Sequence, residues 1–178
     1  MLITFWEPIK LSIIVTIAAG IIVVITGTLF GLLFAKKQFR GKILVETIFM
    51  LPLVLPPSVI GFLLIVVFGN QGVIGTWIKE IFGHSIIFTS YAAVIAATVV
   101  AFPLMFQTAK AGFQGVHRKF EAAAKDLGAT NFQVFLRVSL PLAKRALLTG
   151  TVLSCARALG EFGATLMFAG NIPGVTQT

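Results

Sequence analysis

The chain has 178 residues, of which 57% are hydrophobic and only 11% are charged, against about 25% charged in an ordinary soluble domain. Its 14 Lys and Arg residues outnumber its 6 Asp and Glu residues, which gives a net charge of +8. This composition excludes a disordered chain and a collagen, and the single cysteine, Cys155, excludes a disulfide-stapled secreted domain. A basic balance alone would indicate nucleic-acid binding, but the hydrophobicity argues against that partner.

Four long apolar stretches follow one another along the chain. Three contain no charged residue, and the fourth contains only Arg157 and Glu161. Each is longer than the roughly 20 residues that cross a hydrocarbon core as a helix, and a water-soluble fold could not bury all four. We therefore predict an all-α integral membrane protein, a polytopic helical bundle that forms one domain over residues 1–178, with spans at about 11–35, 47–68, 86–109 and 146–169.

The basic residues gather between the first and second spans and between the third and fourth. These two segments hold eleven Lys and Arg residues and three Asp and Glu residues, which accounts for the whole net charge. Because Lys and Arg mark cytoplasmic loops, both segments are predicted to be cytoplasmic, with the N-terminus, residues 69–85 and the tail outside. The first span follows Glu7 and precedes no small-residue cleavage site, so we expect it to be retained. The charge excess is thus explained by topology, and no nucleic-acid partner is expected.

The second span contains three prolines within six residues, Pro52, Pro56 and Pro57. Proline inside a helix removes a backbone hydrogen bond and clashes with the preceding turn. Two interpretations stay open. One is an ordinary proline kink; the other is a broken helix, with Ser58, that lines a transport path where neighbouring helices or water satisfy the freed carbonyls.

The fourth span carries the two charges at membrane depth. Arg157 and Glu161 are four residues apart, so they share a helical face and can pair. A charge there costs about 3 kcal/mol on insertion scales, so such residues usually face an interior. The pair is either a structural lock between helices or, with Thr165, part of the translocation path. Small residues favour close packing of this span as an inner helix: Ala156, Gly160, Gly163 and Ala164.

Residues 110–145, between the third and fourth spans, are too polar to cross a membrane and too long for a turn. The stretch RKFEAAAKDL at 118–127 is rich in helix formers, and Gly128 suits a helix end. Asn131 can cap a second short helix, and Pro141 fits the first turn of the fourth span.

This cytoplasmic segment offers no catalytic chemistry. Glu121 and Asp126 have no His at metal-ligand spacing, and the sequence contains no phosphate-binding loop, nucleophile elbow or Cys/His cluster. We therefore expect no catalytic or metal site. An exposed, alanine-rich helix can instead dock into another protein, with Glu121 and Lys125 fixing the register; the alternative is an amphipathic connector on the membrane surface.

EAAAKDLGA followed by SLPLA resembles the cytoplasmic EAA-loop signature of the membrane subunits of bacterial binding-protein-dependent ABC importers. The matching residues are Glu121, Ala122, Ala123, Gly128, Leu140 and Pro141. Three further stretches, LPLVLPPSVIGFLL, FPLM and RALGEFGATLMFAGNIPG, resemble the molybdate permease branch. Sulfate and thiosulfate permeases share a similar GEFGA and GNIPG region, so those anions, and tungstate, remain alternatives.

The resemblance implies a type I ABC importer permease in a bacterial cytoplasmic membrane. It implies a homodimer of permease subunits with two cytoplasmic ATP-binding subunits and an external molybdate-binding protein. ATP and Mg would then be held by the partner subunit and no cofactor by this chain. Residues 121–128, with Lys125, would form the ATPase-coupling helix. The family usually has one more span after the GNIPG stretch, so we expect this chain to lack it. A membrane scaffold or channel subunit without ATP coupling would explain the spans but not the EAA pattern.

Overall fold

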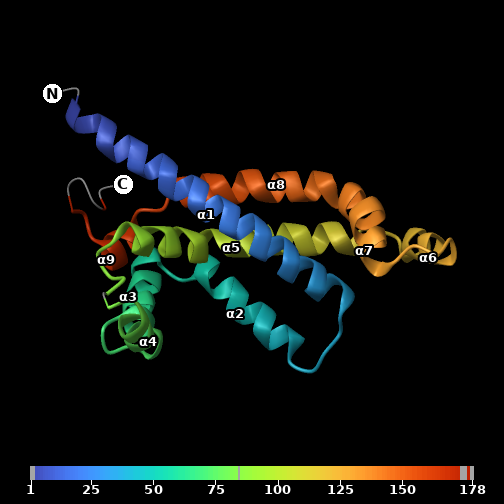
Figure 1. The fold of residues 1–178 in the computed structure, drawn as a ribbon, viewed down its shortest axis with the longest axis horizontal. Helices are drawn as coiled ribbons and strands as arrows, with labels where there is room; N and C mark the ends of the chain where they lie inside the picture. Colours follow the sequence, from blue (N-terminus) through green and yellow to red (C-terminus); the bar gives the residue numbers. More distant parts are fainter. Residues whose placement is uncertain (1–2, 84, 173–175, 177–178) are drawn as a thin grey trace.

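The computed structural model describes residues 3–83, 85–172 and 176, and every regular element within them is helical, as predicted. Figure 1 shows three long helices side by side, with a short helical segment beyond one end of them. The long helices are α1 (Ile3–Lys36), α5 (Ser90–Gln114) and α8 (Leu140–Leu159). The shorter elements are α2 (Lys42–Val54), α3 (Pro57–Phe68), α4 (Val73–Phe82), α6 (Arg118–Asp126), α7 (Asn131–Val134), the π-helical turn η1 (Phe135–Ser139) and α9 (Gly163–Ala169).

Two helices, α1 and α5, are long and apolar enough to cross a membrane alone, and they match the first and third predicted spans. Two further segments meet the same requirement only as bent pairs. The α3–α4 pair bends by 53°, and the pair formed by Asn131–Leu159 and α9 bends by 57°. The described residues therefore provide two to four spanning elements, as expected of a polytopic helical membrane protein.

The second predicted span is interrupted in the middle. Helix α2 ends at Val54, Leu55 is extended with ψ 146°, and α3 begins at Pro57. Both features follow from the sequence, because the residue before a proline is pushed out of the helical region and proline is favoured in a first turn. Of the two interpretations of the prolines, the broken helix therefore describes the backbone at Pro56, while Pro52 lies inside α2.

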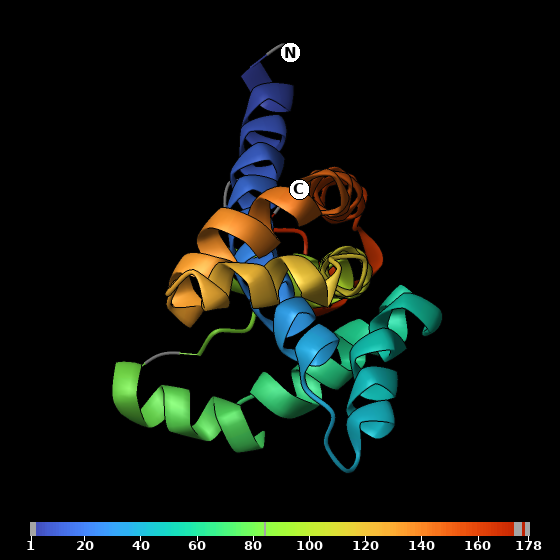
Figure 2. The same cartoon turned by 90° about the vertical axis from the view of Figure 1, so that its right-hand side faces the viewer.

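Helix α5 is the more deeply buried of the two helices that are long enough to cross a membrane alone. Within an apolar stretch of 18 residues in α5, 56% of the stretch is buried, against 28% in the corresponding stretch of α1. Figure 2 looks nearly along α5 and α8 and shows α2, α3 and α4 on one side of that pair. Six of the eleven buried residues of α5 are alanines, and their small side chains let both α1 and α8 approach it closely.

Glycines on α1 set the distance between α1 and α5. A Cβ placed at Gly27 would lie 2.6 Å from Met105 Cγ, and one at Gly31 would lie 2.6 Å from Ala109 Cβ. Both distances are far inside van der Waals contact, so only glycine fits. Gly27 and Gly31 are four residues apart and form a GxxxG pair, the arrangement that lets membrane helices pack backbone to backbone.

A cluster of phenylalanines joins α2 to this pair. Phe49 of α2 lies among rings of α1 and α5, with centroids between 5.1 and 5.7 Å away and mostly edge-to-face. This is the preferred geometry of aromatic pairs. The other members are Phe30, Phe34, Phe102 and Phe106.

The segment after α5 forms one projecting helix, α6, as expected, and Gly128 takes φ +87° after it. The expected cap and the separate second helix were wrong. Thr130, not Asn131, caps α7 through a capping box with Gln133, and α7 runs through η1 into α8 without a break. Pro141 explains η1, because its ring would crowd the carbonyl four residues earlier and a wider π turn relieves that contact.

Candidate functional site

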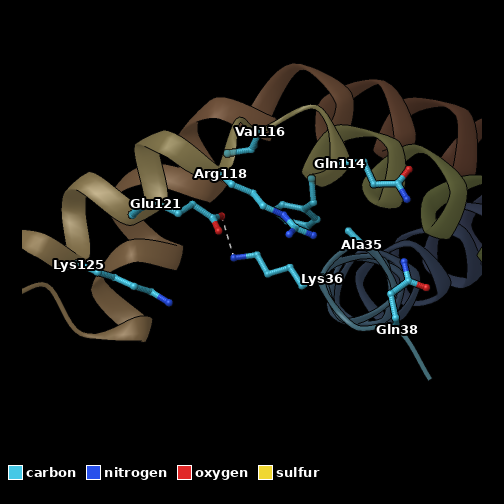
Figure 3. A pocket seen from close by; sticks show the side chains of 10 residues that line it. Ala35, Lys36, Gln38, Gln114, Val116, Arg118, Glu121 and Lys125 are labelled. Carbon is cyan, nitrogen blue, oxygen red and sulfur yellow. Dashed lines mark ion pairs between the residues drawn. The ribbon is translucent and has the colours of Figure 1, made fainter.

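Helix α6 carries two different faces. One face is turned toward a cavity between α6 and the ends of α1 and α5. It consists of residues at the i, i+3, i+4 and i+7 spacing of a helical face, namely Arg118, Glu121, Ala122 and Lys125. Figure 3 shows Arg118, Glu121 and Lys125 leaving α6 on the side of α1. The other face presents exposed apolar side chains, with Phe120 at 55% and Leu127, at the helix end, at 90% exposure.

Glu121 is held by side chains from two other elements. Lys36 Nζ, at the end of α1, lies 2.8 Å from Glu121 Oε1. The hydroxyl of Ser139 in η1, a fully buried residue, donates a hydrogen bond of 2.5 Å to the same oxygen. Lys36 Nζ also donates to Ser139 Oγ at 3.4 Å. We call these three residues, Lys36, Glu121 and Ser139, the junction triad; it ties α6 to a membrane-crossing helix.

Burial raises the pKa of the Glu121 carboxyl, but hydrogen bonds from Lys36 and Ser139 and the charges of Lys36 and Lys125 lower it by more. The net result is a pKa below the ordinary value of 4.5. Glu121 is therefore ionised at neutral pH, and the triad is an ion pair supported by a hydroxyl donor.

Glu121 and Lys125, the two residues expected to fix the register of a docked partner, lie on the face of α6 that is turned toward α1. Glu121 faces α1 and is engaged within the chain, while Lys125 lines the cavity. Ala122 also lines the cavity, whereas Ala123 lies on the exposed side. Gly128 is exposed at the turn after α6. The sequence analysis did not single out Phe120 and Leu127. They lie three residues before and four residues after Ala123, so helical spacing places them on the same face as Ala123.

The second group of candidate residues lies where α8 breaks. Helix α8 ends at Leu159 and α9 begins at Gly163. Glu161 sits between them with its side chain 1% exposed, and Arg157 Nη1 lies 2.7 Å from Glu161 Oε2. The predicted pairing is therefore confirmed, although Glu161 stands beyond the helix end. Its other oxygen accepts a 2.7 Å hydrogen bond from the Ala164 N–H and so caps α9.

The two helix breaks pack against each other. A Cβ at Gly163 would lie 2.8 Å from Pro57 Cβ, and a Cβ at Gly61 would lie 2.6 Å from Met167 Cβ. The beginning of α3 is thus in direct contact with α9. Ser58 is exposed here, while Thr165 is 4% exposed and its hydroxyl donates to backbone carbonyls. A cavity of about 170 Å³ opens beside Glu161 and Thr165, with Ser12 and Thr16 of α1 on its other wall.

Ala156, Gly160 and Ala164 would form a small-residue row on an unbroken helix, with Gly163 beside it, but the structure does not place them on one packing face. The helix stops between them, so Ala156 and Gly160 are exposed on α8 and its end, whereas Gly163 and Ala164 pack on α3. The physical reason is the Gly160–Phe162 break, which turns α9 by 57° away from the α8 axis.

Neither group of residues has the side-chain cluster of a metal site. Across the described residues, no cluster of three or more His, Cys, Asp or Glu side chains could hold a metal ion. The chemistry available is a salt-bridged junction at one end of the bundle and a compensated charge pair where two broken helices meet.

Comparison with known proteins identifies this architecture. The family described as the binding-protein-dependent transport system inner membrane component matches residues 27–178. The chain belongs to this family. It therefore forms the membrane part of a transport system that works with a binding protein, and the polytopic permease fold expected from the EAA signature is confirmed.

Three relatives illustrate the range of the family. YvgM of Bacillus subtilis, provisionally named a molybdenum transport system permease protein, is 58% identical over 98% of this chain and 77% of its own length. The molybdenum transport system permease protein ModB of Escherichia coli K12 is 43% identical over 97% of this chain and 76% of its own. A provisionally named sulfate transport system permease of Prototheca wickerhamii is 39% identical over 89% of this chain and 63% of its own.

Proposed function

We propose that this chain is the permease subunit of an ATP-driven importer that carries molybdate across the cytoplasmic membrane. The observation that carries the proposal is the identity of 58% and 43%, over nearly the whole chain, with two molybdenum transport permeases. The sulfate permease relative, at 39%, keeps sulfate as the competing substrate.

The proposed assembly contains two copies of this permease, two cytoplasmic ATP-binding subunits and an external binding protein. ATP and Mg are held by the ATP-binding subunits, so this chain is not itself the ATPase. The Lys and Arg distribution supports an orientation with the N-terminus outside and α6 in the cytoplasm.

In this proposal α6 is the coupling helix, and its exposed apolar face docks into the ATP-binding subunit. Phe120 and Leu127 are large apolar side chains exposed to water on a helix whose other residues are charged residues and alanines, which is the pattern of an interface anchor. The junction triad supports the coupling role from the other face. Because Glu121 bonds both Lys36 and Ser139, a displacement of α6 pulls on α1 and on the π turn before α8.

The proposed translocation path runs past the two helix breaks, along Pro56–Ser58 and Arg157–Thr165. Arg157 and Glu161 compensate each other, so the path offers no net positive charge that would trap a dianion. The unwound backbone at each break supplies polar groups at membrane depth, where they line a protein-enclosed route rather than lipid.

Anion-stimulated ATP hydrolysis by the complete importer in proteoliposomes tests the substrate. We expect the binding protein loaded with molybdate to stimulate ATP hydrolysis and the binding protein offered sulfate to leave it at the basal rate. Stimulation by sulfate alone would replace the substrate, and no stimulation by either anion would contradict an ATP-coupled permease.

The docking face is tested by replacing Leu127. Leu127→Asp places a charge in the proposed interface and should lower copurification of the ATP-binding subunit at least about tenfold, since an interface anchor contributes about 2 kcal/mol or more. Leu127→Met keeps the apolar contact and is the matched control. If both variants copurified the ATP-binding subunit as well as the wild-type permease does, this face of α6 would be excluded as the docking surface.

A further inference from the structure

The cavity behind α6 has features of a binding site that docking and transport do not explain. It has a volume of about 560 Å³ and opens where two membrane-crossing helices end, at Lys36 of α1 and Gln114 of α5. The charged face of α6 forms its third wall (Figure 3). A cavity of this size accommodates a small polar group of the size of a lipid head group.

The charges in this cavity do not cancel. Glu121 is its one lining carboxylate, and Lys36 neutralises it at 2.8 Å. Arg118 and Lys125 remain, and neither forms an ion pair with another described residue. The amide side chains of Gln38 and Gln114 complete the polar lining and can donate hydrogen bonds.

We propose that this cavity binds the phosphate head group of an anionic phospholipid from the cytoplasmic leaflet. A phosphate diester accepts hydrogen bonds from guanidinium, ammonium and amide groups, and all three kinds of group line this cavity. Basic pockets between membrane helices on the cytoplasmic side recognise anionic head groups in this way. A lipid is favoured over free phosphate as the source of the bound phosphate group, because two of the three walls of the cavity are the ends of membrane-crossing helices. The proposal rests on the cytoplasmic placement of α6 given under the proposed function.

Native mass spectrometry of the complete importer tests the site without reference to transport. The importer is released from nanodiscs that contain equal amounts of phosphatidylglycerol and phosphatidylcholine, and the retained lipids are counted. We expect one phosphatidylglycerol per permease chain. The variant Arg118→Gln/Lys125→Gln should lower its retention about fivefold for each charge removed.

The matched control is Lys144→Gln/Arg145→Gln, which removes the same charge from two exposed residues of α8 outside the cavity. The control should retain phosphatidylglycerol as wild type does. Equal retention by both variants, or equal retention of both lipids by wild type, would overturn the proposal.

A second arm separates the lipid from a free anion. Excess inorganic phosphate is added to importer in phosphatidylcholine alone and in the mixed bilayer. If phosphate binds in the cavity and strips phosphatidylglycerol from wild type, the occupant is a soluble oxyanion and the lipid assignment fails. Because this readout needs no substrate, an error in the transported anion leaves the result unchanged.

Discussion

The carboxylate of Glu121 joins three elements of the chain, because it contacts Lys36 at the end of α1 and Ser139 in η1 from its own position on α6. It forms an ion pair with Lys36, 85 residues away in the sequence, and accepts a hydrogen bond from Ser139, 18 residues away. Lys36 is 38% exposed and Glu121 19%, so the ion pair is partly screened by water and contributes about 1 kcal/mol or less. Its importance therefore lies in geometry, because it fixes the position of α6 relative to α1.

Replacing Glu121 by Gln should give a stability difference that depends on pH. The pKa of this carboxyl is lower in the folded protein than its ordinary 4.5, so its contribution is complete above pH 4.5 and is lost as pH falls through the folded pKa. The difference in Tm between wild type and Glu121→Gln should be constant near neutral pH and shrink below pH 4.5. Thermal unfolding in detergent across this range measures it.

The control for that experiment is Glu80→Gln, which changes an exposed carboxylate of α4 that forms no ion pair with another described residue. It should lower Tm at neutral pH by less than Glu121→Gln does. If the difference in Tm between wild type and Glu121→Gln grew as the pH fell, that result would contradict an ionised Glu121 in the junction triad.

At the scale of whole elements, the contact between α1 and α5 depends on glycines of α1, which have no side-chain atoms to hold the two helices apart. Gly31→Ala would place a Cβ 2.6 Å from Ala109 Cβ and 2.9 Å from the Lys110 backbone nitrogen. A backbone atom cannot rotate away, so the helices must separate. We expect a loss of about 1–3 kcal/mol, measured as reduced resistance to denaturant in mixed micelles.

Gly115→Ala is the matched control for Gly31→Ala. Its Cβ would meet neighbouring carbonyl oxygens at 3.5 Å or more, which is ordinary contact, and its φ of −71° suits alanine. Equal stability of the two variants would mean that α1 and α5 are not packed through this glycine.

The elements themselves were predictable to different degrees for physical reasons. Charge-free length predicted α1 and α5, because lipid requires long apolar helices. The prolines left a kink and a break equally open, and the structure shows the break, with Leu55 extended before Pro56. The break at Gly160–Phe162 was missed, because the four-residue spacing of Arg157 and Glu161 suits an unbroken helix equally well. The Lys36–Glu121 contact could not be predicted, since no local pattern relates residues 85 positions apart.

At the scale of the whole molecule, the two proposed sites lie at opposite ends of the bundle. The junction triad and the α6 faces lie at one end, while the two helix breaks meet near the other, where α3 and α9 pack (Figure 1). Helix α5 runs between these regions and contacts α1, α8 and α9. Movement of α6 can therefore reach the breaks through the packed long helices, provided that the α1–α5 and α5–α8 contacts stay intact.

Accessibility labelling tests whether the breaks line the path. The chain has a single cysteine, so a Cys155→Ala background permits one introduced cysteine at a time. The two test positions are Ser58, which is exposed at the start of α3, and Thr165, which is 4% exposed beside Glu161. We expect a membrane-impermeant thiol reagent to label both positions in the complete importer, with rates that change when ATP is bound. Ile21→Cys, on an apolar exposed face of α1, should remain unlabelled in both states. If Ser58→Cys and Thr165→Cys are as protected as Ile21→Cys in every state, the translocation path lies elsewhere in the bundle.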